Sequence, residues 1–258
     1  MKAIQLNNFP TSWNTIPQQQ LLKIAPLFSS DLKGKQFDLQ LLLLLLNVKW
    51  WQFRKHRKVN ALLSNRVLAD IKQHYEFMYT SCSLTTFIGP LKINRKLWYP
   101  CDDRFSNLSI GEFSVTEDLF LQWHNTNNIE YLRYLAAVIY QPVDALNRAV
   151  FEKKYLESNY KRLAKLNTNQ LLAIGLSYRG CKSQLAKKYK KVFPAPKKST
   201  ETPTVKIKQN TTGLSKVTLQ MAGGKFGAYN ETNNTNVYVF LDEFTEQLIQ
   251  QEDAKRQS

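Results

Sequence analysis

The side chains that could coordinate a metal ion are few and widely separated in this chain of 258 residues. There are three histidines, His56, His74 and His124, and no pair has the Cys-x-x-Cys or His-x-x-x-His spacing that is typical of zinc sites. His56 lies within a run of cations, which would repel a metal ion. We therefore expect structural or surface roles for the histidines, and we expect neither a metal nor another cofactor.

Nucleophilic groups are equally sparse. The three cysteines, Cys82, Cys101 and Cys181, are odd in number and far apart, so we expect reduced thiols and no disulfide framework. The sequence has no Gly-x-Ser-x-Gly motif. The glycine-rich stretch 221–227 lacks the Gly-Lys-Ser/Thr ending of a phosphate-binding loop, and we expect it to be a turn before the last helix. Together these features predict a protein that is not an enzyme.

Basic residues are the main remaining chemical feature. The formal net charge is +16, and residues 141–213 alone contain 16 Lys and Arg against 4 Asp and Glu. A charge excess of this size indicates an acidic partner, either a polyanion or another protein. Two segments concentrate the cations, and each could form a binding surface.

The first segment is 49–58, where cations are interleaved with aromatic rings. Its interaction candidates are Lys49, Trp50, Trp51, Arg54 and Arg57. In one interpretation the cations contact the phosphates of single-stranded nucleic acid while the rings stack on its bases. In the other, the two tryptophans complete the burial of the preceding leucine-rich helix while the cations reach solvent. We favour burial of the tryptophans.

The second segment is 182–198, which contains seven lysines and no acid. Its interaction candidates are Lys187, Lys188, Lys190 and Lys191. Lysine favours diffuse attraction to a negative surface over base-specific recognition. Either a polyanion or an acidic protein would satisfy this surface.

The elements that must position these residues are expected to be mainly α-helical, with a multi-helix globular core and a few short strands. Six consecutive leucines, 41–46, belong to an apolar helix that is too short for a membrane span of about 20 residues, so we expect it in the centre of the core. Capping boxes are expected at Thr15-Ile-Pro-Gln18 and at Ser114-Val-Thr-Glu117. Periodicity and turn residues predict helices over 16–28, 36–48, 60–79, 114–125, 129–140, 145–165, 168–191 and 232–253, and strands at 87–88 and 97–99.

Composition divides the chain into three parts. Residues 1–193 are expected to form the helical core domain, 194–213 a flexible, basic linker rich in Pro, Thr and Lys, and 214–258 a C-terminal helical segment. The last helix is expected to be amphipathic, with a narrow apolar seam formed by Val237, Leu241, Phe244 and Leu248. This seam is suited to folding back on the core or to docking in a partner's groove.

Three stretches resemble a known family. Asn107-Leu-Ser-Ile-Gly-Glu-Phe113, followed by Leu132-Arg-Tyr-Leu-Ala-Ala-Val-Ile-Tyr-Gln-Pro142, is similar to the pattern L-T-x-G-E-F … L-I-A-V-L-Y-R-P of bacteriophage tail-module proteins. Residues 221–236 resemble the closing motif of that group, and Asn8-Phe-Pro-Thr-Ser-Trp-Asn14 is similar to its start. This chain departs from the pattern at Gln141, where the family has arginine.

The resemblance implies a non-enzymatic tail-assembly chaperone or tail component whose partner is a phage tail protein such as the tape-measure protein. We therefore expect a mainly helical protein of the host cytoplasm or the virion, without membrane contact. The rival hypothesis is a basic nucleic-acid-binding protein that uses segments 49–58 and 182–198.

Overall fold

The computed structural model describes residues 9–49, 51–63, 73–142, 148–194 and 212–257 of the chain. Within this part it contains ten α-helices and one two-stranded antiparallel sheet, which confirms the prediction of a mainly α fold with a multi-helix globular core. The α-helices are α1 (Gln18–Ile24), α2 (Gly34–Leu45), α3 (Phe53–Leu63), α5 (Ile110–Thr126), α6 (Glu130–Ile139), α7 (Leu156–Arg162), α8 (Thr168–Lys188), α9 (Leu214–Met221), α10 (Tyr229–Asn234) and α11 (Val237–Gln257). The strands are β1 (Leu91–Ile93) and β2 (Lys96–Trp98), and the short 3-10 helices are η1 (Trp13–Thr15), η2 (Ala25–Ser29), η3 (Glu76–Met78), η4 (Asp103–Phe105), η6 (Lys153–Tyr155) and η7 (Leu163–Lys165).

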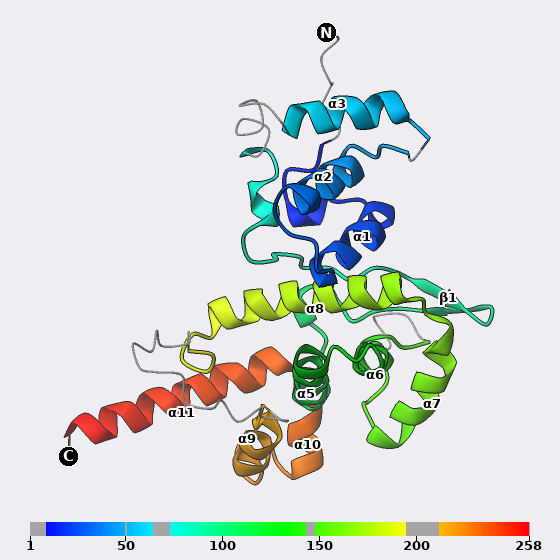
Figure 1. Ribbon diagram of the computed structural model, residues 1–258. Helices are drawn as coiled ribbons and strands as arrows, with labels where there is room; N and C mark the ends of the chain where they lie inside the picture. The colour runs from blue at the N-terminus through cyan, green and yellow to red at the C-terminus, as the bar shows by residue number, and fades with distance from the viewer. Residues whose placement is uncertain (1–8, 50, 64–72, 143–147, 195–211, 258) are drawn as a thin grey trace.

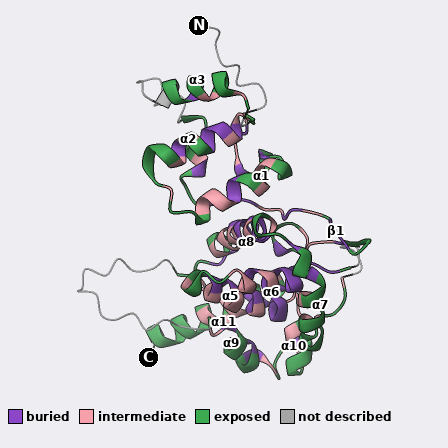
Figure 2. Cartoon of the chain, turned by 45° about the vertical axis from the view of Figure 1, so that its right-hand side comes forward, coloured by how far each residue is buried: buried purple, intermediate pink, exposed green. Residues whose placement is uncertain are grey.

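Helix α8 crosses the middle of the molecule and separates two groups of elements (Figure 1). Helices α1, α2 and α3 lie on one side, with α3 the most distant from α8, and α5 and α6 lie on the other. Helix α8 contacts α1 and η2 in the first group and α6 in the second. Most of α3 at one end of the molecule, and the last turns of α11, are exposed (Figure 2).

The leucine run forms the buried centre of the N-terminal group, as its composition predicts. Leu41, Leu42 and Leu45 of α2 are each at most 3% exposed. The first helix is shorter than predicted, because α1 ends at Ile24 and the chain continues as η2. Pro26 has no amide hydrogen to donate to the carbonyl four residues earlier, so the α-helical pattern ends there.

Both predicted capping boxes are misplaced. The hydroxyl oxygen of Thr15 accepts hydrogen bonds from two backbone amides of the preceding turn and closes η1 instead of capping α1. Ser114 and Glu117 lie inside α5, which is capped by Ser109 and Glu112. The sequence contains two Ser-x-x-Glu patterns five residues apart, and the extended backbone at Ser109 (ψ 158°) starts the helix at the first.

Of the helix predicted over 60–79, residues 60–63 belong to α3, which begins earlier, at Phe53. A turn directly precedes α3, in which the amide N of Gln52 donates to the carbonyl O of Lys49 at 2.9 Å. Farther along, the backbone of Tyr75 (φ −128°, ψ 19°) is not helical, and only the 3-10 turn η3 follows. The middle of the predicted helix lies outside the described residues.

The sheet is a hairpin in which β1 and β2 pair antiparallel through Leu91 with Trp98 and Ile93 with Lys96. The strand predicted at 97–99 lies one residue earlier, as β2, and the strand predicted at 87–88 is wrong, because those residues have no regular secondary structure. Asn94 and Arg95 have positive φ angles of 50° and 67°, the backbone that a two-residue hairpin turn requires. The sequence gives little sign of this turn because arginine rarely adopts positive φ.

Helix α8 is unbroken although it contains two glycines, and both lie at close contacts. A Cβ atom on Gly180 would lie 2.5 Å from the carbonyl O and 2.7 Å from the amide N of Leu84. A Cβ on Gly175 would lie 3.0 Å from the side chain of Leu132 in α6. The glycines therefore allow neighbouring backbone and helix to approach α8 closely.

The last helix, predicted over 232–253, is divided into α10 and α11. The division falls at Thr235, where the backbone is extended and pairs with the start of α5. The carbonyl O of Thr235 accepts from the amide N of Ile110 at 2.8 Å, and the carbonyl O of Leu108 accepts from the amide N of Val237 at 2.9 Å. These long-range hydrogen bonds replace the helical ones that the local pattern favours.

The C-terminal residues 214–257 pack on the rest of the chain. Helices α9, α10 and α11 all contact α5, and Val237, Phe240 and Leu241 are fully buried. Residues 195–211 of the predicted linker lie outside the described residues. The predicted C-terminal segment thus contributes to the same core as the residues before the linker.

Candidate binding surfaces

Residues that carry the family resemblance meet in a buried polar network at the start of α5. The carboxylate of Glu112 is 3% exposed and accepts at Oε1 from Nε (3.1 Å) and Nη2 (2.8 Å) of Arg148. Its Oε2 accepts from the amide N (3.0 Å) and the hydroxyl (3.2 Å) of Ser109. The side-chain amide of Gln141 donates to Oε1 at 3.4 Å. We call Glu112, Gln141 and Arg148 the polar hub.

Arg148 is the hub residue that the sequence did not reveal, because no local motif contains it. Its guanidinium is 8% exposed and also donates to the carbonyl oxygens of Val138 (2.7 Å) and Ile139 (2.9 Å), the last residues of α6. It therefore caps α6 and neutralises Glu112 at once.

The polar hub also explains why residues 148–152, inside the helix predicted over 145–165, are not helical, and why η6 and α7 begin after them. The amide N of Ala149 donates to Oε1 of Gln141 at 2.8 Å, and the carbonyl O of Ala149 accepts from Nε2 of Gln141 at 3.3 Å. Both backbone groups are thus bonded to a side chain of another segment, so they do not join a helix. Residues 148–152 have no regular secondary structure.

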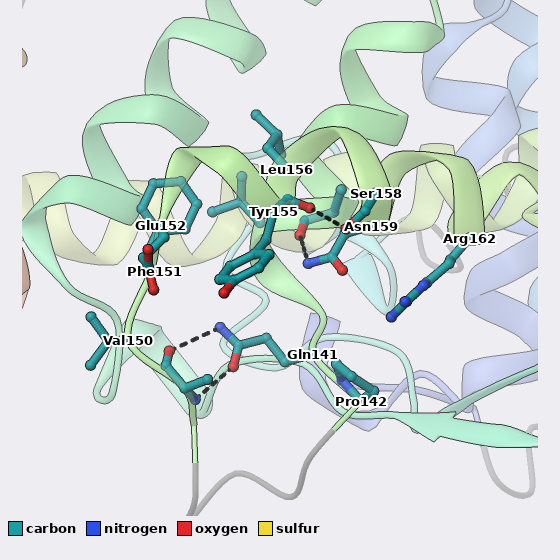
Figure 3. Close-up of a pocket in the computed structure, with 13 residues that line it drawn as sticks. Gln141, Pro142, Val150, Phe151, Glu152, Tyr155, Leu156, Ser158, Asn159 and Arg162 are labelled. Atoms are coloured by element: carbon teal, nitrogen blue, oxygen red, sulfur yellow. Dashed lines mark hydrogen bonds between the residues drawn. The ribbon is translucent and has the colours of Figure 1, made fainter.

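A pocket of about 280 Å³ lies beside this segment, between α6 and α7 (Figure 3). Its wall includes no histidine or cysteine, and Gln141 in that wall is bonded to Ala149. The hydroxyl of Ser158 donates to the carbonyl O of Tyr155 in its own turn, and the carboxylate of Glu152 lies 2.5 Å from Nζ of Lys154. No wall residue therefore pairs a nucleophile with a base.

A second, larger pocket of about 510 Å³ lies on the other side of the same segment. It is bounded by the start of α5, by residues 150–154 and by α10, and its polar wall includes Asn230, Asn233 and Asn234. Amide side chains can donate and accept hydrogen bonds but do not titrate. Glu152, Lys153 and Lys154 also line this pocket, so its wall offers charged groups as well as amides to a polar ligand.

The three cysteine thiols are free and buried. Burial raises the pKa of Cys82 to about 11 and that of Cys181 to about 12, and it raises the pKa of Cys101 well above its ordinary value. A thiol that stays protonated is a weak nucleophile and a weak metal ligand. Across the described ranges, no group of three or more His, Cys, Asp or Glu residues is placed to hold a metal ion.

The second predicted basic surface lies at the C-terminal end of α8, where lysines also complement the helix dipole. Its candidates are Lys187, Lys188, Lys190 and Lys191, and we call them the lysine surface. Acids of α11 approach it: Nζ of Lys191 lies 2.6 Å from Oε2 of Glu252, and Nζ of Lys188 lies 3.6 Å from Oδ1 of Asp242. Segment 182–198 contains no acid, but its net positive charge is partly neutralised in the structure because α11 places carboxylates beside it.

The first predicted basic surface differs from the favoured interpretation. Trp51 is 56% exposed and Phe53 is 65% exposed, so Trp51 does not complete the burial of the leucine helix. Val59 of α3, 1% exposed, lies in the core that contains the leucine helix. Trp50 lies outside the described residues. Aromatic rings at the start of α3 are thus presented to solvent, and this correction reopens the alternative interpretation.

Cations lie on the same exposed part of α3. We define the aromatic-basic strip as Trp51, Phe53, Arg54, Arg57 and Lys58, all of which are exposed. Among the described residues, no carboxylate forms an ion pair with these cations. Lys49, also exposed, has its carbonyl O bonded to the imidazole of His56, at 3.1 Å from Nε2. Within the described residues, the strip therefore lacks the carboxylate partners that the lysine surface has.

The apolar seam of α11 packs largely inward. Val237 and Leu241 are fully buried, and Phe244 packs against the core while remaining partly exposed. Leu248 is half-buried, and Ile249 beside it is 39% exposed. Of the two uses expected for the seam, folding back on the chain itself accounts for its first two residues.

The structure brings some of the candidates together and separates others. The lysine surface lies beside α11, and the ion pair of Lys191 with Glu252 joins the two. The aromatic-basic strip lies at the far end of the molecule, beyond α2 (Figure 1). The two basic segments therefore do not form one continuous site.

Comparisons with known proteins give no match: no protein-family model, no curated protein and no solved structure matches this chain. In the described part of the chain, no helix combines the length and the apolar character that crossing a membrane requires.

Proposed function

We propose that this chain is a non-enzymatic bacteriophage tail-assembly protein, either chaperone-like or a tail component. In this proposal it acts through contacts with other tail proteins such as the tape-measure protein, in the host cytoplasm during assembly or in the virion. The observation that supports the proposal is the convergence of three stretches that resemble the tail-module family. Residues 132–142 and 221–236 are far from residues 107–113 in sequence, yet both contact that first stretch.

Two contacts illustrate this convergence. The side-chain amide of Gln141 donates to Glu112 and joins the second stretch to the first. A Cβ atom on Gly111 would lie 3.0 Å from the carbonyl O of Asn233, so the glycine lets the third stretch approach the first. Proteins that share a fold would retain the residues that hold its segments together, and these two contacts are of that kind. The residues of the resemblance thus act on the fold, and binding would depend on surfaces that this fold presents.

The test is affinity capture of the tagged full-length chain from phage-infected cells, with a salt wash that removes weak ionic contacts. We expect the tape-measure protein or another tail protein to be recovered. A matched bait, Arg54→Glu with Arg57→Glu, reverses charge on the exposed face of α3 and shows whether capture depends only on positive charge. Recovery of neither protein, with the chain also absent from assembling particles, would overturn the proposal.

A second candidate function is nucleic-acid binding, and one observation favours it. The cations of the aromatic-basic strip have no acidic neighbour in sequence between Asp38 and Asp70, whereas the lysine surface is partly neutralised. This candidate predicts binding to oligonucleotides that weakens steeply as salt rises, because bound phosphates release counterions. Arg57→Glu should weaken binding more than the matched reversal Lys187→Glu. Equal effects would contradict a role for α3.

A further inference from the structure

The exposed rings of Trp51 and Phe53 contrast with the chain's other described tryptophans. Trp13 and Trp98 are at most 2% exposed and Trp123 is 9% exposed, whereas Trp51 is 56% exposed. Leaving a large ring in water forgoes the stabilisation that its burial would provide. Two such rings, separated only by Gln52, therefore leave aromatic surface exposed to solvent beside the start of α3.

The cations beside these rings are arranged by the helix. Residues four apart are neighbours on a helix surface, so Phe53 lies next to Arg57, and Arg54 lies next to Lys58. Val59, on the opposite side of α3, is buried in the core. The solvent-facing side therefore combines an aromatic–cation pair with a pair of like charges.

This arrangement lowers the stability of α3 in two ways. Arg54 lies in the first turn, which contains no acid, so its charge faces the positive end of the helix dipole. Arg54 and Lys58 also repel each other at a spacing of four residues. Both effects would be relieved by a bound anion, and they raise the local positive potential that attracts one.

The ligand that fits these features must carry repeated negative charges and also flat apolar faces. Single-stranded nucleic acid has both, because its phosphates can contact the cations while its unpaired bases stack on the rings. In a duplex the bases are already stacked on one another. A negatively charged membrane fits less well, because the buried side of α3, marked by Val59, packs on its own chain and is not free to enter lipid.

We infer that the aromatic-basic strip binds single-stranded nucleic acid, with bases stacked on Trp51 and Phe53 and phosphates held by Arg54, Arg57 and Lys58. This inference rests on the second candidate function and adds the form of the nucleic acid and the surface that binds it. Stacking needs no particular base, so the strip binds single strands with little sequence preference.

The test is fluorescence anisotropy with labelled oligothymidylate of about 16 nucleotides or more and, as comparison, a duplex of equal length, at several salt concentrations. We expect Trp51→Ala and Phe53→Ala each to weaken single-strand binding about 5- to 150-fold, with little effect on duplex binding. Trp51→Phe should retain most of the affinity because it keeps an aromatic face. Arg57→Ala should lower affinity and reduce the slope of its salt dependence.

Tyr155→Ala is the matched control, because Tyr155 is 51% exposed and follows two lysines, of which Lys154 is paired with Glu152. It should leave binding unchanged. Circular dichroism and the melting temperature will show that the α3 variants remain folded. Equal affinity for single strand and duplex, with no effect of Trp51→Ala, overturns the stacking inference but leaves the second candidate function standing. Binding to neither nucleic acid, or only to anionic vesicles, overturns both.

Discussion

At the scale of single residues, the polar hub shows what sequence could and could not reveal. Glu112 belongs to a stretch that carries the family resemblance, and in the structure it caps α5. Its partner Arg148 could not be predicted, because it lies 36 residues away and belongs to no motif. The same limit applies to Trp51: local pattern indicated a ring beside an apolar helix, but only the three-dimensional packing decides whether that ring is covered.

Arg148→Ala should lower the free energy of unfolding by about 3–5 kcal/mol, because it leaves the carboxylate of Glu112 buried without its cation. Urea unfolding followed by circular dichroism measures this change. Lys154→Ala, which breaks the exposed pair with Glu152, is the control and should have little effect. Similar costs for the two variants would show that the hub does not stabilise the fold.

The buried thiols predict how stability depends on pH. The pKa of Cys181 is raised in the folded state to about 12, so folding favours its protonated form. Its contribution to stability is complete below its unfolded pKa of about 9 and is lost as pH rises from there towards 12. Unfolding measured at several pH values should show this loss, and Cys181→Ala should make the loss smaller. An unchanged pH profile in the variant would contradict the assignment.

At the scale of elements, apolar periodicity located most helices, but their ends depended on partners elsewhere in the chain. The prediction for α8 was close to its observed range because Asn167 and Gln170 form a local capping box. The division between α10 and α11 was missed because hydrogen bonds between residues 108–110 and 235–237 set it. The start of α5 was missed because two Ser-x-x-Glu patterns lie close together and the first one, Ser109 to Glu112, caps the helix. Local patterns do not encode which distant backbone a segment will meet.

Gly180→Ala tests the close approach at α8. Alanine is favoured over glycine in an isolated helix by about 1 kcal/mol. Here its Cβ would overlap the backbone of Leu84, so we expect destabilisation by about 1–3 kcal/mol and a lower melting temperature. Gly175→Ala meets only the side chain of Leu132, which can move, and should cost less. A stabilised Gly180→Ala variant would contradict the packing described for α8.

At the scale of the whole molecule, composition predicted a helical core, a linker and a C-terminal segment. It did not predict how closely the last segment joins the core. The hydroxyl of Tyr189 donates to Oδ1 of Asp242 at 2.8 Å, and that of Tyr238 donates to the carbonyl O of Arg104 at 2.6 Å. These contacts join residues more than fifty positions apart, so the periodicity within α11 could not predict them.

Phe240→Ala tests whether α11 belongs to the cooperative core. Phe240 is fully buried, so its truncation should cost about 3–5 kcal/mol and lower the melting temperature of the entire chain in a single transition. Val239→Ala, at the adjacent position, removes a side chain that is 54% exposed and should leave stability nearly unchanged. If α11 were only tethered, Phe240→Ala would leave the melting of the core unaffected.

The pairing of residues 108–110 with 235–237 has a consequence for biosynthesis. The side-chain amide of Asn236 donates to the carbonyl O of Ser106 across 130 residues of chain, so α5 acquires these neighbours only after residues 235–237 have been translated. A nascent chain that stalls before this point keeps the apolar surface beneath α11 uncovered. Burial of that surface is thereby coupled to the synthesis of α11, and products terminated before α11 would expose the surface to chaperones and proteases.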